Sequence, residues 1–268
     1  MHFAENGDVR LAYERAGTDA GETVVFVEGL GYGRWMWRWQ REALAGDYDV
    51  LLPDNRGTGS SDAPEGPYTI REMAADLEAV LADADVDEAH VVGASMGGMI
   101  AQRYALDYER AASLTLLCTT PGGPDEVPIP ESTLERMFGV PEEYDEREAI
   151  RYKMEPAMTD EFWAANDDLI ADIVDWRLET DADDQPRQWQ GAAVEAFDVS
   201  DRLDELALPT LILHGERDQV VPVGNGELLA DGIPDPTFET FDEGGSHLFF
   251  IERADAVSER IRSFLAGQ

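Results

Sequence analysis

The sequence predicts an α/β fold in which a mostly parallel sheet is flanked by helices and carries an inserted helical cap. Three observations support this fold class. Short runs of Val, Ile and Leu recur with the continuous apolar character of strands buried on both faces. Amphipathic helical stretches separate several of these runs, as right-handed crossovers between parallel strands require. The alternation stops between about Pro121 and Val199 and resumes at Thr210.

Six short apolar runs are the predicted strands, and the first five have the pattern of a sheet that is buried on both faces. They are Thr23–Glu28, Val50–Pro53, His90–Gly93, Leu114–Thr119, Thr210–His214 and Thr237–Phe241. The opening segment Phe3–Ala16 has a central Asn6-Gly7-Asp8 turn. That turn predicts an antiparallel hairpin at the edge of the sheet.

The stretch Tyr68–Ala84 is predicted to contain a helix, because apolar residues recur in it at helical spacing with acidic residues on the other side. Thr69 and Glu72 have the spacing of a capping box, in which each side chain bonds the backbone N–H of the other. We therefore expect the helix to begin directly after Thr69.

Residues 121–199 are predicted to form a helical cap over the C-terminal edge of the sheet, inserted into a core of residues 1–120 and 200–268. Pro121-Gly122-Gly123-Pro124 marks a sharp change of direction at its start. Helical stretches follow without a strand between them: Glu146–Met154, Thr159–Ala165, Asp167–Leu178 and Arg187–Phe197. We expect most of the large apolar side chains here to pack and some to line a substrate cavity; they are Met154, Met158, Trp163, Trp176 and Trp189.

The charge of the chain is unusual. Asp and Glu number 57 against 20 Lys and Arg, which gives a formal net charge of −37. The carboxylates are spread along the chain, which argues against an acidic interaction tail. Such a surface repels itself in dilute buffer, whereas molar salt shortens the Debye length to about 3 Å. The composition predicts an extreme halophile, an archaeal one, with an acidic mesophilic protein as the alternative. It argues against nucleic acid as a partner, which needs clustered basic residues.

Compartment and bound groups are predicted from what the sequence lacks. No apolar run approaches the roughly 20 residues that span a bilayer, and the N-terminal residues have no basic segment followed by an apolar stretch. We therefore expect no membrane partner, no secretory signal and a cytoplasmic location. Cys118 is the single cysteine and is interpreted as a small core residue. The four histidines are dispersed without metal-ligand spacing, so we expect no metal and no cofactor. The oligomeric state stays open between monomer and dimer.

Ser95 is the predicted nucleophile. The segment His90–Gly98 ends a strand, passes through a G-x-S-x-G sequence and continues into a helix. That context is typical of a nucleophile elbow, in which the serine occupies a strained strand-to-helix turn and glycines let the backbone bend tightly. A bare G-x-S-x-G is common by chance, and its position between strand and helix makes it informative.

His247 is the predicted base, because a serine hydroxyl needs a group that takes its proton. It follows the last predicted strand, where a loop can present it to the nucleophile. The other histidines are placed less well. His2 is terminal, His90 begins the elbow strand and so lies at its wrong end, and His214 is interpreted as a structural residue that ends a strand.

Asp218 is the predicted acid, which would orient the histidine and stabilise the imidazolium. It lies in the loop after Thr210–His214, and Glu216 in the same loop is its rival. In a chain with 57 acidic residues one carboxylate on a loop means little. The order Ser, Asp, His, each at the C-terminal end of a strand, supports the assignment.

Two backbone N–H groups are predicted to stabilise an oxyanion. Met96 follows the nucleophile directly, and the glycine-rich turn Glu28-Gly29-Leu30-Gly31 offers Leu30. Each donor of this kind contributes roughly 10²–10³ in rate. The alternative interpretation of the second segment is an ordinary glycine turn.

The whole chain resembles the α/β-hydrolase superfamily with a helical cap. Four segments are similar to the group of 3-oxoadipate enol-lactonases, small carboxylesterases and cofactor-free haloperoxidases: Asp54–Asp62, Gly93–Gly98, Leu213–Pro222 and Gly244–His247. By this resemblance Ser95, Asp218 and His247 match the catalytic triad, and Leu30 and Met96 match the oxyanion positions. The resemblance also implies that Asp54 and Arg56 hold a loop by a buried ion pair. Many members have His-Gly where this chain has Glu28-Gly29, so the hydrogen bonding of that turn is open.

The expected reaction is hydrolysis of small carboxylic esters or lactones through an acyl-enzyme on Ser95. Members that open epoxides or displace halides use an aspartate nucleophile, and Ser95 argues against both. A general carboxylesterase and an enol-lactonase remain alternatives, because the cap shapes the pocket and its loops vary freely. A non-catalytic ligand receptor on the same fold is a further alternative, since fold does not determine function.

Overall fold

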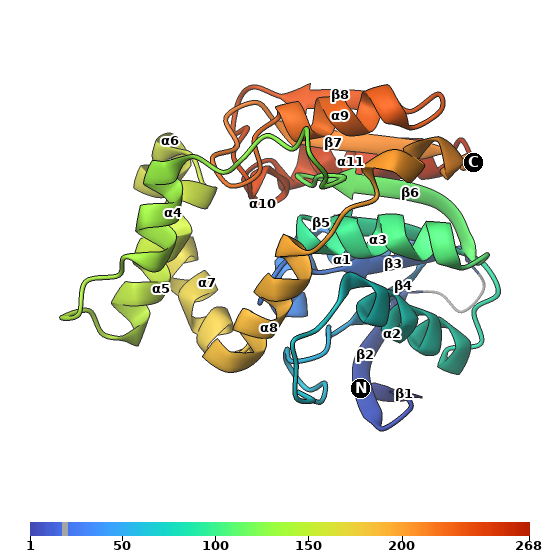
Figure 1. The fold of residues 1–268 in the computed structure, drawn as a ribbon, viewed down its shortest axis with the longest axis horizontal. Helices are drawn as coiled ribbons and strands as arrows, with labels where there is room; N and C mark the ends of the chain where they lie inside the picture. The colour runs from blue at the N-terminus through green and yellow to red at the C-terminus, as the bar shows by residue number, and fades with distance from the viewer. Residues whose placement is uncertain (18–20) are drawn as a thin grey trace.

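One eight-stranded sheet organises the described residues, 1–17 and 21–268, of the computed structural model (Figure 1). The strands lie in the order β1-β2-β4-β3-β5-β6-β7-β8, and the six from β3 to β8 run parallel. Their bounds are β1 His2–Asn6, β2 Val9–Gly17, β3 Thr23–Val27, β4 Asp49–Pro53, β5 Ala89–Ala94, β6 Ala111–Leu117, β7 Thr210–Gly215 and β8 Thr237–Phe241. The predicted mostly parallel α/β sheet is confirmed.

The opening hairpin also forms as predicted. β1 and β2 pair antiparallel around a turn at Gly7 and Asp8, and β2 joins β4 antiparallel, so the hairpin forms one edge of the sheet. Gly7 has φ +61°, a backbone conformation that favours glycine. The fourth predicted strand ends earlier than expected, at Leu117, because Cys118 has φ +41° and leaves the extended conformation.

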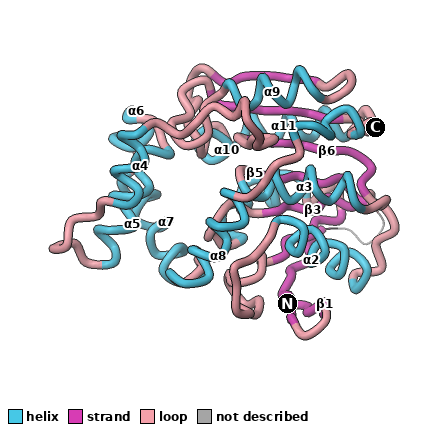
Figure 2. Tube along the Cα trace, viewed as in Figure 1, coloured by secondary structure: helices cyan, strands magenta, loops and turns pink. Residues whose placement is uncertain are grey.

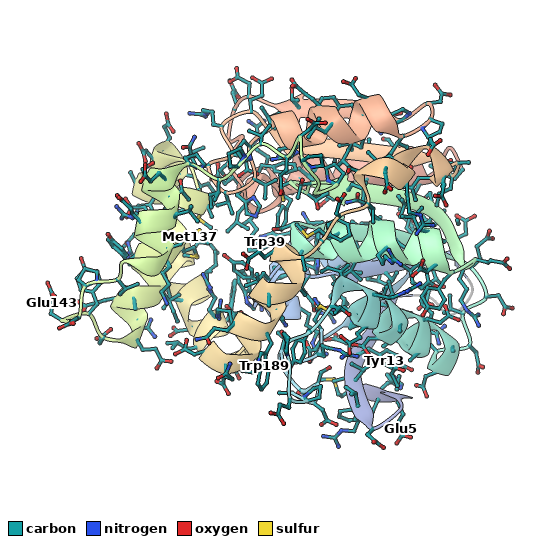
Figure 3. All side chains as sticks on the ribbon, viewed as in Figure 1. Glu5, Tyr13, Trp39, Met137, Glu143 and Trp189 are labelled. Atoms are coloured by element: carbon teal, nitrogen blue, oxygen red, sulfur yellow. The ribbon has the colours of Figure 1, made fainter. Side chains whose placement is uncertain are left out.

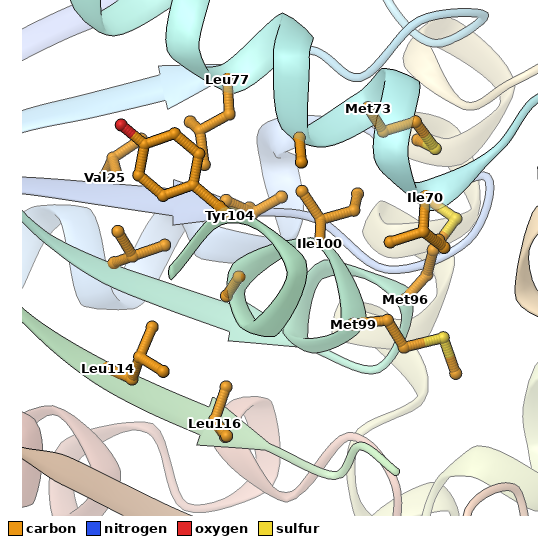
Figure 4. Packing of buried hydrophobic residues seen from close by; sticks show 14 of the residues in the cluster. Val25, Ile70, Met73, Leu77, Met96, Met99, Ile100, Tyr104, Leu114 and Leu116 are labelled. Atoms are coloured by element: carbon orange, nitrogen blue, oxygen red, sulfur yellow. The ribbon is translucent and has the colours of Figure 1, made fainter. Parts of the chain in front are cut away.

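Helices cover both faces of the sheet. α2 and α3 pack on one face, where side chains of α3 interdigitate with those of α2 and of the strands beneath (Figure 4). α1 and α11 pack together on the opposite face. The helices outside the insertion are α1 Arg38–Leu44, α2 Ile70–Asp83, α3 Met96–Asp107, α9 Gly224–Gly232, α10 Phe249–Glu252 and α11 Ala254–Leu265, with 3₁₀ turns at Arg34–Trp37 and Ser200–Glu205.

The alternation of residues along β3 explains why the central strands are continuously apolar. Val24 and Phe26 face the α1/α11 side, whereas Val25 and Val27 face the α2/α3 side, and all four are fully buried. Because both faces are covered, each strand needs a continuous apolar run and not an alternating one. The α2 helix begins as predicted: Thr69 and Glu72 form a capping box.

The segment between β6 and β7 is helical. Among the described residues it contains helices and loops but no strand, and it lies to one side of the sheet (Figures 1 and 2). Its elements are α4 Glu131–Phe138, α5 Glu146–Met154, the 3₁₀ turn Glu155–Ala157, α6 Asp160–Ala165, α7 Asp167–Thr180 and α8 Asp184–Glu195. The two ends of the segment meet, because Gly122 and Asp198 form an isolated antiparallel bridge.

The α4 helix was not expected from the sequence. It follows Pro130 without a side-chain cap, and the apolar Leu134 on it is 38% exposed. Its apolar residues do recur at helical spacing, but eight residues are only about two turns and no capping side chain marks the start, so the pattern is too short to identify a helix.

The expected ion pair between Asp54 and Arg56 is wrong. Arg56 is buried and donates to Asp76 of α2 at 2.6 and 2.8 Å. Asp54 lies 3.4 Å from Arg34 and accepts the N–H of Ser60 at 2.9 Å. The chain leaves β4 at Pro53 and turns at Arg56, and each of these two side chains pairs with a charged residue on another element. Within the described residues, every helix is too short or too polar to cross a membrane.

Candidate active site

Ser95 occupies a strained turn between β5 and α3. Its backbone has φ 54° and ψ −121°, a conformation that L-residues rarely adopt and that costs about 1–3 kcal/mol. The glycines around it are required by close backbone approach. A Cβ on Gly97 would lie 2.1 Å from the carbonyl oxygen of Val27, and one on Gly93 would lie 2.2 Å from that of Gly97. The structure therefore has the local geometry of a nucleophile elbow.

Hydrogen bonds hold the backbone of Ser95 on both sides. Its N–H donates to the carbonyl of Leu117 at the end of β6, at 2.9 Å. Its carbonyl accepts from the N–H of Gly98 at 2.9 Å and from the Thr119 hydroxyl at 2.7 Å. The elbow is thus anchored to the neighbouring strand, and the surrounding structure offsets its strain.

The turn Gly29–Tyr32 lies beside Ser95. A Cβ on Gly29 would be 3.6 Å from the Cβ of Ser95. The N–H of Tyr32 donates to the carbonyl of Gly29 at 3.2 Å, and Gly31 has φ +74°. These two features are typical of a type II turn, which requires glycine at its third position. We call Gly29–Tyr32 the oxyanion turn.

Two backbone N–H groups at this place have no acceptor. In the described part of the chain, neither the N–H of Leu30 nor that of Met96 donates a hydrogen bond, although Met96 is fully buried. Buried backbone N–H groups are rarely left without a partner. An arrangement of two free donors next to a strained serine is suited to hold a negatively charged oxygen.

Glu28, which precedes the oxyanion turn, is fully buried. Its main-chain carbonyl accepts from the side-chain amide of Asn55 at 3.1 Å, which is how the chain holds the start of the turn. Both side-chain oxygens lack a hydrogen-bond partner among the described residues. Burial, and next the nearby Asp54 carboxylate, raise the pKa of Glu28 well above its ordinary value. The side chain is therefore favoured in its neutral form.

Asp218 and His247 meet at the C-terminal ends of β7 and β8. His247 Nδ1 lies 2.8 Å from Asp218 Oδ2, and both residues are buried. The other oxygen, Oδ1, accepts the N–H groups of Val220 and Val221 at 2.8 and 2.9 Å. Burial alone would raise the pKa of Asp218, but the His247 charge and hydrogen bonds from His214 and His247 lower it to about 2. The carboxylate stays ionised across the neutral range.

His214 also touches this pair, a contact that the sequence interpretation missed. Its Nε2 lies 2.8 Å from the carbonyl of Val221 and 3.5 Å from Asp218 Oδ2, and the ring is fully buried. The interpretation as a hydrogen-bonded structural histidine agrees with these contacts. A signal was present in the sequence, because His214 ends the strand only four residues before Asp218.

Cys118 is a second residue whose place the sequence did not indicate. It is buried, as expected, and its sulfur lies within 4.8 Å of ligand atoms on both Asp218 and His247. These three residues could hold a metal ion by distance alone. The oxygens of Asp218 already accept from two backbone N–H groups and from the histidine. Burial raises the pKa of the Cys118 thiol, so the free thiolate is disfavoured.

The rival residues lie elsewhere. His90 Nδ1 bonds the hydroxyl of Ser113 at 2.8 Å, beside a hollow of about 670 Å³ at the other end of β5 from Ser95. Burial lowers the pKa of His90. Glu216 is exposed and accepts the hydroxyl of Thr240 at 2.6 Å. His2 stacks on Tyr13, with 5.1 Å between ring centroids.

The hydroxyl of Ser95 does not bond His247 among the described contacts. Ser95 is partly exposed. Its N–H donates to Leu117, and the sulfur of the next residue, Cys118, lies within 4.8 Å of ligand atoms on Asp218 and His247. Catalytic hydrogen bonds are often long in proteins without substrate and shorten when substrate binds. Of the predicted site residues, the structure brings Asp218 and His247 into contact, and it places Leu30 and Met96 beside Ser95.

Comparison with known proteins shows which family the chain belongs to. A family profile described as alpha/beta hydrolase fold matches residues 22–149. The putative carbamate hydrolase RutD from Azorhizobium caulinodans is 33% identical over 98% of this chain and 98% of its own length. The chain belongs to the α/β-hydrolase family. The predicted fold class is confirmed, and the protein is a hydrolase.

Two further likenesses concern enol-lactonases. The 3-oxoadipate enol-lactonase 2 from Acinetobacter baylyi is 24% identical to this α/β-hydrolase, over 99% of the chain and 97% of its own length. The crystal structure of the enol-lactonase from Burkholderia xenovorans LB400 superimposes with a TM-score of 0.85 at 26% identity, and covers 99% of this chain and 100% of its own. The resemblance expected from the four sequence segments is confirmed.

Proposed function

We propose that this α/β-hydrolase cleaves small carboxylic esters or lactones through an acyl-enzyme on Ser95. The observation that carries the proposal is the 2.8 Å contact between His247 Nδ1 and Asp218 Oδ2. This pair follows the C-terminal ends of its strands, as Ser95 follows the C-terminal end of β5 in the strand-to-helix turn. In this arrangement Asp218 orients the imidazole so that Nε2 is free to act as the base.

The reaction has two halves. His247 Nε2 takes the proton of the Ser95 hydroxyl while the oxygen attacks the carbonyl carbon, and the carbonyl oxygen becomes an oxyanion bound by the N–H groups of Leu30 and Met96. The imidazolium then gives its proton to the departing alkoxide. Water repeats the sequence on the acyl-enzyme and releases the acid. Asp218 stays ionised throughout, as its pKa of about 2 requires.

A lactone and an open ester share this chemistry, because in a lactone the leaving alkoxide stays attached to the acyl group. Similarity to enol-lactonases supports the lactone. The 33% identity to a putative carbamate hydrolase favours carbamates as a second candidate substrate, in which nitrogen is bonded to the same carbonyl. We further propose that residues 121–199 act as a cap that selects among these substrates.

The test is turnover by purified protein in concentrated salt. Short-chain p-nitrophenyl esters, simple lactones and a p-nitrophenyl carbamate are offered to wild type, to Ser95→Ala and to a control, Ser263→Ala, which changes an exposed serine on α11. We expect wild type and the control to cleave at least one class, and Ser95→Ala to lose it. Equal activity of Ser95→Ala refutes the serine mechanism. Folded wild type that cleaves none of them favours a ligand receptor.

A further inference from the structure

One side chain of α8 joins the helical segment to the oxyanion turn. Gln190 is fully buried, and its Oε1 accepts the N–H of Gly31 at 2.7 Å. Its Nε2 donates to the carbonyl of Arg56 at 2.8 Å and to the hydroxyl of Thr58 at 3.0 Å. The partners fix which end of the amide is which, since an N–H requires oxygen and a carbonyl requires the NH₂ group.

The N–H that Gln190 binds belongs to the central peptide of the turn. Types I and II turns differ by a flip of this peptide, and φ +74° at Gly31 corresponds to type II. The carbonyl of Gly31 accepts the N–H of Ala182 at 2.9 Å, so segment 182–190 holds both polar groups of this residue. Arg187 fills the adjacent space: a Cβ on Gly31 would lie 2.6 Å from its Nη1.

Leu30 lies between two anchors. On one side Asn55 binds the carbonyl of Glu28, and on the other Gln190 binds the N–H of Gly31. The N–H of Leu30 is left without an acceptor, although the groups on either side of it are bonded. Figure 1 shows α8 next to the core. Trp189 on the same helix, labelled in Figure 3, packs on Tyr68 with ring centroids 5.5 Å apart.

We propose that Gln190 is a positioning residue that holds the Leu30 N–H in place by anchoring the next residue, Gly31, and that the helical segment thereby controls the oxyanion site. The inference rests on the proposed acyl-enzyme function. Donors stabilise an oxyanion only at about 2.7–3.1 Å from where the charge develops, and small displacements at such sites reduce rates by up to about 100-fold. Without Gln190 the turn loses this anchor, so Leu30 can shift and carry its N–H away from the oxyanion. The transition state then loses more binding than the substrate does.

The experiment compares Gln190→Leu and Gln190→Glu with Gln188→Leu, which changes an exposed glutamine on the same helix. We expect Gln190→Leu to reduce kcat about 10- to 100-fold with little change in KM. The affinity for a boronic acid, whose tetrahedral adduct places an oxygen in the oxyanion site, should fall in parallel. A purely packing role predicts a loss of stability with kcat and boronic acid affinity unchanged, and that result overturns the proposal.

The Gln190→Glu variant gives a second readout. A carboxylate can accept from Gly31 but cannot donate to the carbonyl of Arg56, whereas a protonated carboxyl group can do both. The ratio of its kcat to that of wild type at the same pH should therefore rise as the pH falls. A ratio that does not change with pH contradicts the inference. This variant also keeps the test valid if Gln190→Leu fails to fold.

Labelling of Ser95 with a fluorophosphonate tests the proposed acyl-enzyme function and the proposed role of Gln190 separately. If wild type is not labelled, the proposed acyl-enzyme function fails. If wild type is labelled and Gln190→Leu is labelled at the same rate, the function stands and the role of Gln190 is refuted. Slower labelling of Gln190→Leu, with Gln188→Leu at the wild-type rate, supports the proposal.

Discussion

Replacement of Glu28 by Gln tests the electrostatics of the oxyanion turn. Glu28 is fully buried, both of its carboxyl oxygens lack a hydrogen-bond partner among the described residues, and Asp54 is a second acid nearby. Its pKa is raised well above 4.5, first by burial and then by Asp54, while Arg34 opposes the shift. In the unfolded chain the carboxyl ionises near pH 4.3. Folding above that pH therefore requires the uptake of a proton.

The size of the effect follows from this proton uptake. A carboxyl whose pKa is raised on folding gives full stability below its unfolded pKa, and that stability is lost as the pH rises toward the folded pKa. The loss is about 1.4 kcal/mol per pH unit. Between pH 5 and pH 7 wild type should lose up to about 3 kcal/mol for this reason. Glu28→Gln has no proton to bind, so the variant escapes this loss.

The assay is urea unfolding at fixed molar salt, followed by tryptophan fluorescence at pH 5, 6 and 7. The measured quantity is the stability of Glu28→Gln minus that of wild type, in which any constant cost of a buried amide cancels. It should increase with pH. The control is Glu143→Gln, at an exposed loop position (Figure 3), for which the difference should stay near zero. A difference for Glu28→Gln that is equal at all three pH values would refute the reasoning, because it would mean that Glu28 is ionised in the folded protein.

Three further predictions follow from the site, the elbow and the charge. His247→Ala should reduce turnover by about 10⁴-fold or more, because triad members act as a unit. His90→Ala should leave turnover near that of wild type, and an equal loss in folded His90→Ala would show that His247 is wrongly assigned as the base. Gly97→Ala should lower the free energy of unfolding by more than about 2 kcal/mol, because its Cβ would meet the carbonyl of Val27 at 2.1 Å. Gly46→Ala, where a Cβ has open space, should change the free energy of unfolding little in the same urea titration. The net charge of −37 should lower the free energy of unfolding below about molar salt, because the carboxylates are then less screened. Circular dichroism during dialysis can follow the loss of structure, and full stability in dilute buffer would exclude a halophilic protein.

The sheet could be predicted because its signals are local. Each buried strand requires an apolar run, and the helix at Ile70 requires a cap that Thr69 and Glu72 supply. The elbow could be predicted for the same reason, since its glycines are needed where backbone atoms approach closely. Ends of elements were less certain: β6 ends at Leu117 because Cys118 turns to positive φ, which apolar character does not reveal.

The contacts that hold the site together could not be predicted, because they join distant parts of the chain. Arg56 pairs with Asp76 and not with Asp54, and Gln190 reaches a turn 159 residues away. In a chain with 57 acids, sequence offers many partners for each arginine and nothing that selects among them. The place of Cys118 beside Asp218 likewise depends on two neighbouring strands that are far apart in sequence.

The most direct test of the central claim is the trapping of an acyl group on Ser95. Wild type is mixed with a substrate that it turns over, quenched in acid within milliseconds to seconds, and digested for peptide mass spectrometry. The account predicts the acyl mass on the peptide that contains Ser95, and its absence from Ser95→Ala. Rapid turnover that leaves the acyl group on another residue, or an unmodified Ser95 under conditions in which acyl transfer to water is slow, would contradict it.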